Sequence, residues 1–225
     1  MSFLSGAMVV LAKDVRIELR TREIVTTAGF FGVLVALMAA IAYTGGASAH
    51  VRVAPGTIWL ATAFASIMAI GRTWQRERED GCFTGLLVTP LSRGALFLGK
   101  AIGVFAFVTA VEIVVVPVVA LVFHLELAEL AAPMALVLVL GTIGVASIGT
   151  LFGAMTVRTR ARDLVLATVI FPLLSPTLLS GVAATREIVA GATIAEVRDY
   201  LILLLTFDAI AVAGGLGLFG ALVDE

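Results

Sequence analysis

Six long apolar stretches constrain the fold of this chain more than any other feature. Each has the length, roughly 17–25 residues, that a helix needs to cross the hydrocarbon core of a bilayer. With 60% of its 225 residues hydrophobic and 14% charged, the chain has too much apolar surface for a water-soluble domain. We therefore predict an all-α integral membrane protein whose six transmembrane helices lie at Ile24–Tyr43, Pro55–Gly71, Gly99–Phe123, Pro133–Met155, Leu164–Val182 and Tyr200–Val223.

The basic residues predict the orientation of these six spans. Short cytoplasmic loops carry an excess of lysine and arginine. Twelve of the 15 basic residues fall in the N-terminal stretch and in the loops after the second and fourth spans: Lys13, Arg16, Arg20, Arg22, Arg72, Arg76, Arg78, Arg93, Lys100, Arg158, Arg160 and Arg162. Only Arg52, Arg186 and Arg198 fall on the other side. We expect both termini in the cytoplasm.

Residues 1–23 have the pattern of an amphipathic helix that precedes the six-span domain at residues 24–225. An apolar stripe runs along it, formed by Met8, Leu11, Ala12, Val15 and Leu19. A helix with such a stripe lies in the membrane interface, with its apolar side in lipid and its basic side toward headgroups. The alternative is a solvated extension of the first span.

The segment 72–98, between the second and third spans, is more elaborate than a linker. It holds a charged run, a helix-breaking glycine, an apolar patch and a proline, and Ser92 is placed to cap the next helix. We predict a helical extension, a turn, a short helix along the membrane, a second turn and re-entry. Its rigid, charged surface favours docking of a soluble partner, and the alternative is an ordinary interfacial helix. The candidate coupling residues are Arg76, Glu77, Arg78, Glu79, Asp80, Gly81, Phe83, Leu86, Leu87, Pro90 and Arg93.

Three stretches resemble one family of membrane subunits. The pattern RERExGxxxxLLxxPLSRxxLFLGK over residues 76–100 is similar to the loop between the second and third spans of export-type ATP-binding-cassette permeases. It most resembles the haem exporter protein B (CcmB) family of cytochrome c maturation. FPLLSPTLLSGVAATREIVAG and the ending LLLTFDAIAVAGGLGLFGALVDE agree with this family. Cys82-Phe83-Thr84 departs from it, since many members have a small residue, Leu and an acidic residue there.

The resemblance implies a function and a set of partners. It implies a permease subunit in a bacterial inner membrane that couples ATP hydrolysis to haem delivery or to release of the haem-loaded chaperone. ATP would bind to a separate ATPase subunit, CcmA, and haem would be cargo, so that this chain is not an enzyme and holds no cofactor. The implied partners are a second copy of the chain, CcmA, CcmC, CcmD, the haem chaperone CcmE and membrane lipid, with no nucleic acid. The alternative is a permease of another export-type transporter, for a drug, lipid or polysaccharide.

The resemblance also gives the coupling residues roles. Glu77, Glu79 and Asp80 would pair with basic residues of the ATPase. Phe83, Leu86 and Leu87 would fill a cleft in it. The arginines of the segment would meet acidic partners or lipid headgroups.

Two acidic residues, Glu112 and Asp208, fall within the third and sixth spans at comparable depth. Because a carboxylate facing lipid is costly, each should face protein or a water-filled cavity, or be protonated. They form either a polar patch for substrate or partner, or hydrogen bonds that fix helix packing. An intramembrane enzyme using both as an acid–base pair, and a passive scaffold, are further hypotheses.

Other features of the sequence add less. Pro117, Pro172 and Pro176 interrupt the third and fifth spans and predict kinks, which either let a helix pivot or only shape packing. Two histidines and the single Cys82 cannot build a metal site alone.

Overall fold

The computed structural model describes residues 2–43, 47–79, 81–155 and 166–224. Within these ranges the chain is helical and has no strand. The elements are α1 Phe3–Thr21, α2 Glu23–Ala42, α3 Ala47–Glu79, α4 Cys82–Val88, α5 Arg93–Val122, α6 Leu127–Met155, the π-helical turn η1 Leu166–Ile170, α8 Phe171–Val189 and α9 Arg198–Asp224. Among the described residues, six of these helices contain segments long and apolar enough to cross a membrane. The expected all-α, six-span architecture is confirmed.

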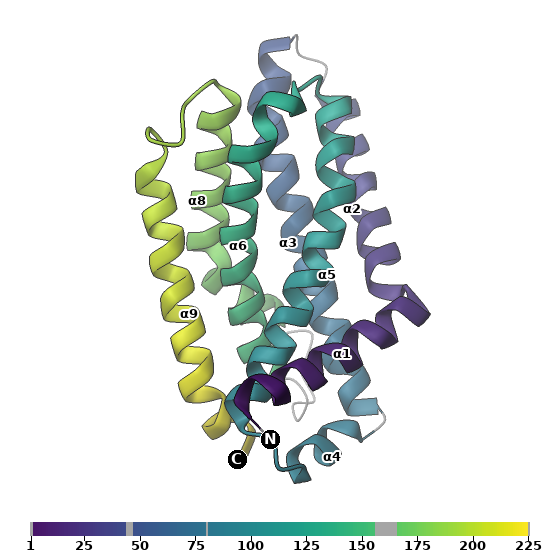
Figure 1. Ribbon diagram of the computed structural model, residues 1–225. Coiled ribbons are helices and arrows are strands. Elements are labelled where there is room, and N and C mark those ends of the chain that lie inside the picture. Colours follow the sequence, from purple (N-terminus) through teal and green to yellow (C-terminus); the bar gives the residue numbers. More distant parts are fainter. Residues whose placement is uncertain (1, 44–46, 80, 156–165, 225) are drawn as a thin grey trace.

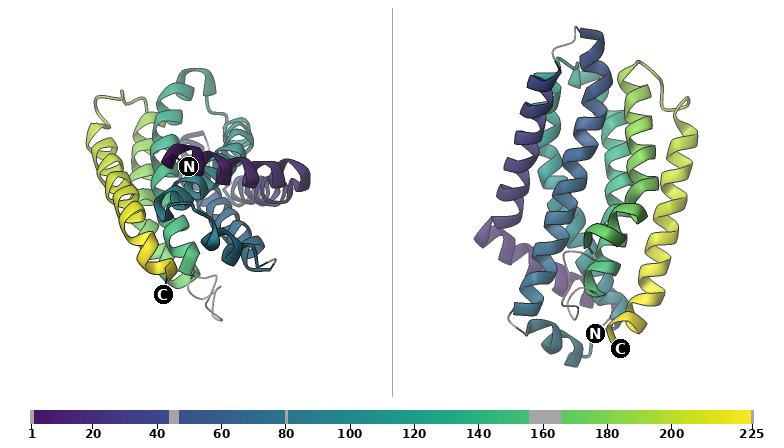
Figure 2. Two further views of the ribbon diagram at one scale, coloured as in Figure 1. Left: turned by 60° about the horizontal axis from the view of Figure 1, so that its bottom comes forward. Right: turned by 180° about the vertical axis from the view of Figure 1, so that it is seen from behind.

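The six spans run side by side as a bundle, and both chain termini lie at one end of it, here called the base (Figure 1). The chain runs away from the base in α2, α5 and α8 and returns in α3, α6 and α9. The helices α1 and α4 lie across the base (Figures 1 and 2). The predicted short helix between two turns in segment 72–98 therefore exists, as α4. Residues 1–23 likewise contain a helix, and its assignment to the membrane interface stays a prediction.

The fifth span differs from its predicted bounds. It was expected at Leu164–Val182, whereas η1 begins at Leu166 and α8 continues to Val189; residues 164 and 165 lie outside the described ranges. Two prolines lie near its start. Pro172 occupies the first turn of α8, and Pro176 lies inside the helix. The carbonyl of Pro172 loses its helical partner to the ring of Pro176, and the Ser175 hydroxyl donates to that carbonyl at 2.7 Å.

Helices α3 and α6 form the centre of the bundle. Each packs against α5 and α8 as well as against the other, while α2 and α9 lie at the outside. The outer helices expose large apolar side chains, including Phe30 and Ile41 on α2 and Ile210 on α9, at 66–78% of their surface. Exposed apolar surface of this extent suits contact with lipid.

Bulky side chains of α3 fit against glycines of α6. A Cβ atom added at Gly141 would lie 2.2 Å from the ring of Trp59, and one added at Gly149 would lie 2.1 Å from Ile70. Farther toward the base, a Cβ at Gly153 would lie 2.4 Å from Trp74. Glycine thus permits a close approach of the two backbones that alanine would block. The α3–α6 pair is consequently packed tightly along much of its length.

Two adjacent glycines in α9 allow this packing to be tested with a matched pair. A Cβ at Gly215 would lie 1.9 Å from the buried ring of Phe97, whereas one at Gly214 meets nothing within 4 Å. We expect Gly215→Ala to lower the free energy of unfolding by about 1–3 kcal/mol through overpacking. Gly214→Ala should change it little or raise it by up to about 1 kcal/mol, because alanine favours a helix. Unfolding in detergent micelles measures both, and equal stability of the two variants would contradict the packing described.

Candidate functional site

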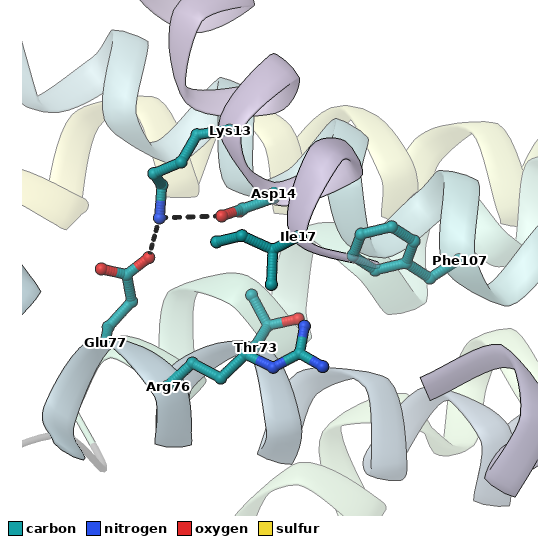
Figure 3. Close-up of a pocket in the computed structure, with 7 residues that line it drawn as sticks. All are labelled: Lys13, Asp14, Ile17, Thr73, Arg76, Glu77 and Phe107. Atoms are coloured by element: carbon teal, nitrogen blue, oxygen red, sulfur yellow. Dashed lines mark hydrogen bonds and ion pairs between the residues drawn. The ribbon is translucent and has the colours of Figure 1, made fainter. Parts of the chain in front are cut away.

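A ring of four charged residues at the base, three of them buried, joins three helices. Glu77, in the last turn of α3, is 2% exposed, and its Oε1 atom accepts hydrogen bonds from both Lys13 of α1 and Lys100 of α5. Asp14 of α1 lies between the same two lysines, with its Oδ1 2.9 Å from Nζ of Lys13 and its Oδ2 2.9 Å from Nζ of Lys100. Figure 3 shows Lys13 between the two carboxylates. We call these four residues the charge ring.

The charge ring is balanced, which explains how it survives burial. Lys100 is fully buried, and Asp14 is 6% exposed. Removal of such groups from water costs several kcal/mol per charge unless each is paired and hydrogen-bonded. Two lysines face two carboxylates here, and the ammonium of Lys100 also lies 5.5 Å above the ring of Trp74, a favourable cation–π geometry. The position of α1 against α3 and α5 is therefore fixed by charge as well as by apolar contact.

Lys13 is the least buried member of the charge ring, and its pKa reflects its neighbours. Partial burial of the ammonium lowers the pKa of Lys13, but Asp14 and Glu77 beside it raise the pKa by more. The net pKa therefore lies above the ordinary lysine value. A raised pKa means that this lysine's stabilising contribution is complete below the unfolded-state pKa and is lost only as pH rises through the folded-state pKa. The ring thus keeps this charge through the whole neutral range.

A second set of ion pairs fixes the corner between α1 and α2. The guanidinium of Arg76 lies 3.3 Å from Oε2 of Glu18 and 3.1 Å from Oε2 of Glu23, and it donates to the Thr21 hydroxyl at 2.9 Å. Arg72 lies 2.8 Å from the other oxygen of Glu23. The planar fork of arginine suits such multiple contacts. One side chain of α3 therefore holds the end of α1 and the start of α2.

The α1–α2 corner is tight because a single residue joins the two helices. Arg22 adopts a left-handed conformation, with φ 53°. The Oε1 atom of Glu18 accepts hydrogen bonds from the backbone N–H groups of Ile24 at 2.8 Å and Val25 at 3.0 Å. Glu18 thus caps the start of α2, where a carboxylate also complements the helix dipole.

A small cavity of about 80 Å³ adjoins the charge ring. Its walls come from α1, α3 and α5 and include Ile17, Thr73, Arg76 and Phe107 beside members of the ring (Figure 3). The hydroxyl of Thr73 and the Oε2 atom of Glu77 are buried there without a hydrogen-bond partner. A polar cavity of this size has room for water molecules that would satisfy such atoms.

The segment 72–98, here called the coupling segment, turns its apolar side toward the bundle. Phe83 of α4 is 5% exposed and packs edge-on against Trp74, with ring centroids 5.8 Å apart. Leu86 and Leu87 are half-buried against the same core. Among the residues from 81 to 92 whose burial the structure describes, the exposed ones are instead Gly81, Gly85, Val88, Thr89, Pro90 and Ser92. The expected apolar patch exists, but it anchors α4 to its own chain.

The ends of α4 follow the local sequence signals. Gly81 has φ 61°, the left-handed turn that ends the α3 extension and starts α4. Ser92 caps α5 as predicted, since its hydroxyl accepts from the N–H of Ala95 at 3.3 Å. The Arg93 guanidinium donates to the carbonyl of Leu87 at 3.1 Å and so holds the end of α4.

The structure separates the charged run of the coupling segment into two groups. Arg76 and Glu77, expected to face a partner, are instead bound within the chain, because a buried charge needs its counterion close by. Arg78 is exposed. Glu79 is the last residue of α3. Its side chain and the whole of Asp80 lie outside the described part of the structure.

Six charged residues of these networks were not identified as paired from the sequence: Lys13, Asp14, Glu18, Glu23, Arg72 and Lys100. Asp14 and Glu18 lie off the predicted apolar stripe of α1, yet both are buried. They continue the face of α1 that Ala7 and Val10 begin, and this spacing was the available signal. Lys100 was counted only as a basic residue of the loop.

The two carboxyls within the spans approach the central helix α6 at nearly the same level. Glu112 is 6% exposed and accepts a hydrogen bond from the Thr142 hydroxyl at 2.7 Å. Asp208 is also 6% exposed, and its Oδ1 would lie 2.5 Å from a Cβ on Gly144. Positions 142 and 144 differ by about 3 Å along a helix. Among the described residues neither carboxyl forms an ion pair, and both oxygens of Asp208 have no hydrogen-bond partner.

The charge ring makes a strong prediction for Lys100. Lys100→Met should lower the free energy of unfolding by about 3–5 kcal/mol, because Asp14 and Glu77 then share a single lysine in a buried site. The double variant Lys100→Met/Glu77→Gln restores charge balance and should recover part of this loss. Arg186→Met removes an exposed pair at the other end of the bundle and should cost at most about 1 kcal/mol. Unfolding in micelles measures all three, and a Lys100→Met protein as stable as the parent would refute the ring.

Together these features define a multi-pass helical membrane protein with a helix lying across its base and a short helix in the loop after its second span. The model of the CcmB protein family matches residues 5–220, nearly the whole chain. The chain belongs to this family, and the resemblance expected from the sequence is confirmed.

Curated relatives agree with the family assignment. The chain is 29% identical to the heme exporter protein B of Bradyrhizobium diazoefficiens over 184 residues, which cover 80% of this chain and 81% of the relative. It is 26% identical to the protein of the same name from Pseudomonas aeruginosa over 211 residues, or 92% and 94% of the two chains. A heme exporter protein B from Paracoccus denitrificans is 32% identical over 143 residues, or 63% and 64%.

Proposed function

We propose that this chain is the permease subunit of an ATP-binding-cassette transporter for cytochrome c maturation. Two copies of it would form the membrane part, and two copies of a separate ATPase subunit, CcmA, would bind beneath. The family match over residues 5–220 carries this proposal, and the names of the relatives support haem as the cargo. CcmC, CcmD and the haem chaperone CcmE complete the proposed assembly. The work of the transporter is delivery of haem or release of the haem-loaded chaperone, with ATP bound only by CcmA.

In this proposal the base of the bundle faces the bacterial cytoplasm. Both termini lie at the base (Figure 1), and the excess of basic residues in the N-terminal stretch and in segment 72–98 supports a cytoplasmic position. The exposed apolar residues Phe3, Leu4 and Met8 of α1 would then lie in the inner leaflet. Arg16 and Arg20, also exposed, would meet headgroups.

The geometry of the base supports a route by which an ATPase moves the bundle. A partner that contacts the outward side of α4 pushes on a helix anchored by Phe83 to Trp74 of α3. The last turn of α3 is tied through Glu77 to α1 and α5 at once. Movement of α4 therefore reaches three helices together. In this refined proposal Arg78, Glu79, Asp80 and the outward side of α4 contact the ATPase, while Arg76 and Glu77 transmit.

The acidic pair at the end of α3 tests the docking proposal. Reversal by Glu79→Lys/Asp80→Lys should weaken binding of the ATPase subunit at least about tenfold, because like charges then meet across the interface. The matched control is Glu126→Lys/Glu129→Lys, which reverses two exposed acidic residues at the opposite end, one just before α6 and one in its first turn. Co-purification and ATP turnover of the assembled transporter measure the effect. Retained binding with normal turnover in the first variant would defeat the proposal.

Asp208 should be separable from docking. It lies 16 residues from the end of α9 at the base, or about 24 Å along the helix. Asp208→Asn has nearly the same shape, and we expect it to leave ATPase binding within about twofold of the parent, well under 1 kcal/mol. Co-purification of the two subunits measures this. Loss of binding would mean that Asp208 holds the whole bundle together.

A further inference from the structure

A groove between α5 and α6 runs from mid-membrane depth toward the end of the bundle away from the base. Its volume is about 290 Å³, close to the lower limit for small-molecule sites. The walls are apolar and include Ile113, Pro117, Ala131 and Ala135, all of which are exposed. On the α6 side the groove is open because Ala131 and Ala135, one helical turn apart, have small side chains. The groove is therefore accessible from the lipid side.

The end of the groove at mid-membrane depth is polar. Glu112 and Thr109 line it, and the Thr109 hydroxyl oxygen is buried without a hydrogen-bond partner. Glu112 is 94% buried and is held by the Thr142 hydroxyl at 2.7 Å, with the Thr62 hydroxyl also within hydrogen-bonding reach. No basic side chain among the described residues forms an ion pair with it. A carboxylate without a counterion at this depth is costly, so a cation in the groove would be strongly favoured.

We propose that this groove binds a lipophilic amine that enters from the bilayer. The ammonium would donate hydrogen bonds to the Glu112 carboxylate and the Thr109 hydroxyl, and the apolar body would lie along Ile113, Pro117 and Ala135. Glu112 lies 10 residues from the end of α5, about 15 Å along the helix, so a phospholipid headgroup at the surface does not reach it. A molecule with a charged carboxylate would be repelled there. The groove therefore does not suit the acidic end of an amphiphile.

The test uses the full-length chain in lipid nanodiscs, alone and with its partner subunits. The probe is an alkyl diazirine with a terminal primary amine, and the matched probe carries a carboxylic acid on the same alkyl chain. After photolysis, mass spectrometry of peptides locates the label. We expect the amine to label α5 and α6 peptides of the groove at least about tenfold more than the acid does, the ratio expected for a hydrogen bond to a charged group.

Three variants make the assignment specific. Glu112→Gln should bring labelling by the amine down to the level of the acid. Ala135→Phe fills the groove and should abolish labelling by the amine. Ala132→Phe makes the same change at an exposed position of α6 outside the groove and should leave labelling unchanged.

Several results would overturn the proposal. These are equal labelling by amine and acid, labelling of the Glu112→Gln protein at the parent level, or label confined to other helices. Labelling that occurs in the isolated chain but is blocked in the assembled transporter would mean that a transmembrane helix of another subunit occupies the groove. The inference is independent of docking, because Glu79→Lys/Asp80→Lys should leave labelling by the amine unchanged.

Discussion

The cost of burying charge organises the base of this protein. Lys100 is wholly removed from solvent, and such an ammonium is tolerable only when carboxylates lie against it. Its two carboxylates come from different helices, Asp14 on α1 and Glu77 on α3. If α3 moved away alone, Asp14 would be left as the one carboxylate beside both lysines of the ring, and if α1 moved away alone, Lys100 would keep Glu77 but lose Asp14.

This constraint ties α1 by charge to the spans at the base. The helix has an apolar side that remains exposed and an inward side with Ala7, Val10, Asp14 and Glu18. Glu18 both caps α2 and pairs with Arg76 of α3. Asp14 and Glu18, which lie one helical turn apart on one face, thus tie α1 to α2, α3 and α5. In the proposed coupling route, a displacement of the end of α3 is transferred to α1 by these ion pairs.

The sequence predicted the features that are set locally and missed those set by tertiary pairing. Span length is dictated by bilayer thickness, so the six helices could be found from apolar runs alone. The turn at Gly81 and the cap at Ser92 depend on a few neighbouring residues, and both were found. The charge ring pairs Asp14 with Lys100, 86 positions apart, and neither segment by itself shows that its charge is buried. The burial of Phe83 against the bundle was missed for the same reason, since its partner Trp74 lies on α3, before the turn at Gly81.

A stiff path leads from the base toward mid-membrane depth. On α3, Trp74, Ile70 and Trp59 fit successively against Gly153, Gly149 and Gly141 of α6. Because a bulky side chain in each notch prevents the helices from sliding past one another, α3 and α6 should move as one body. Between the notches at Gly149 and Gly141, α6 meets Glu112 at Thr142 and Asp208 at Gly144. In the proposed route, a push on α4 that is carried by α3 would reach α6 where it meets these two carboxyls. The charged base would thereby be linked to the carboxyls in the membrane.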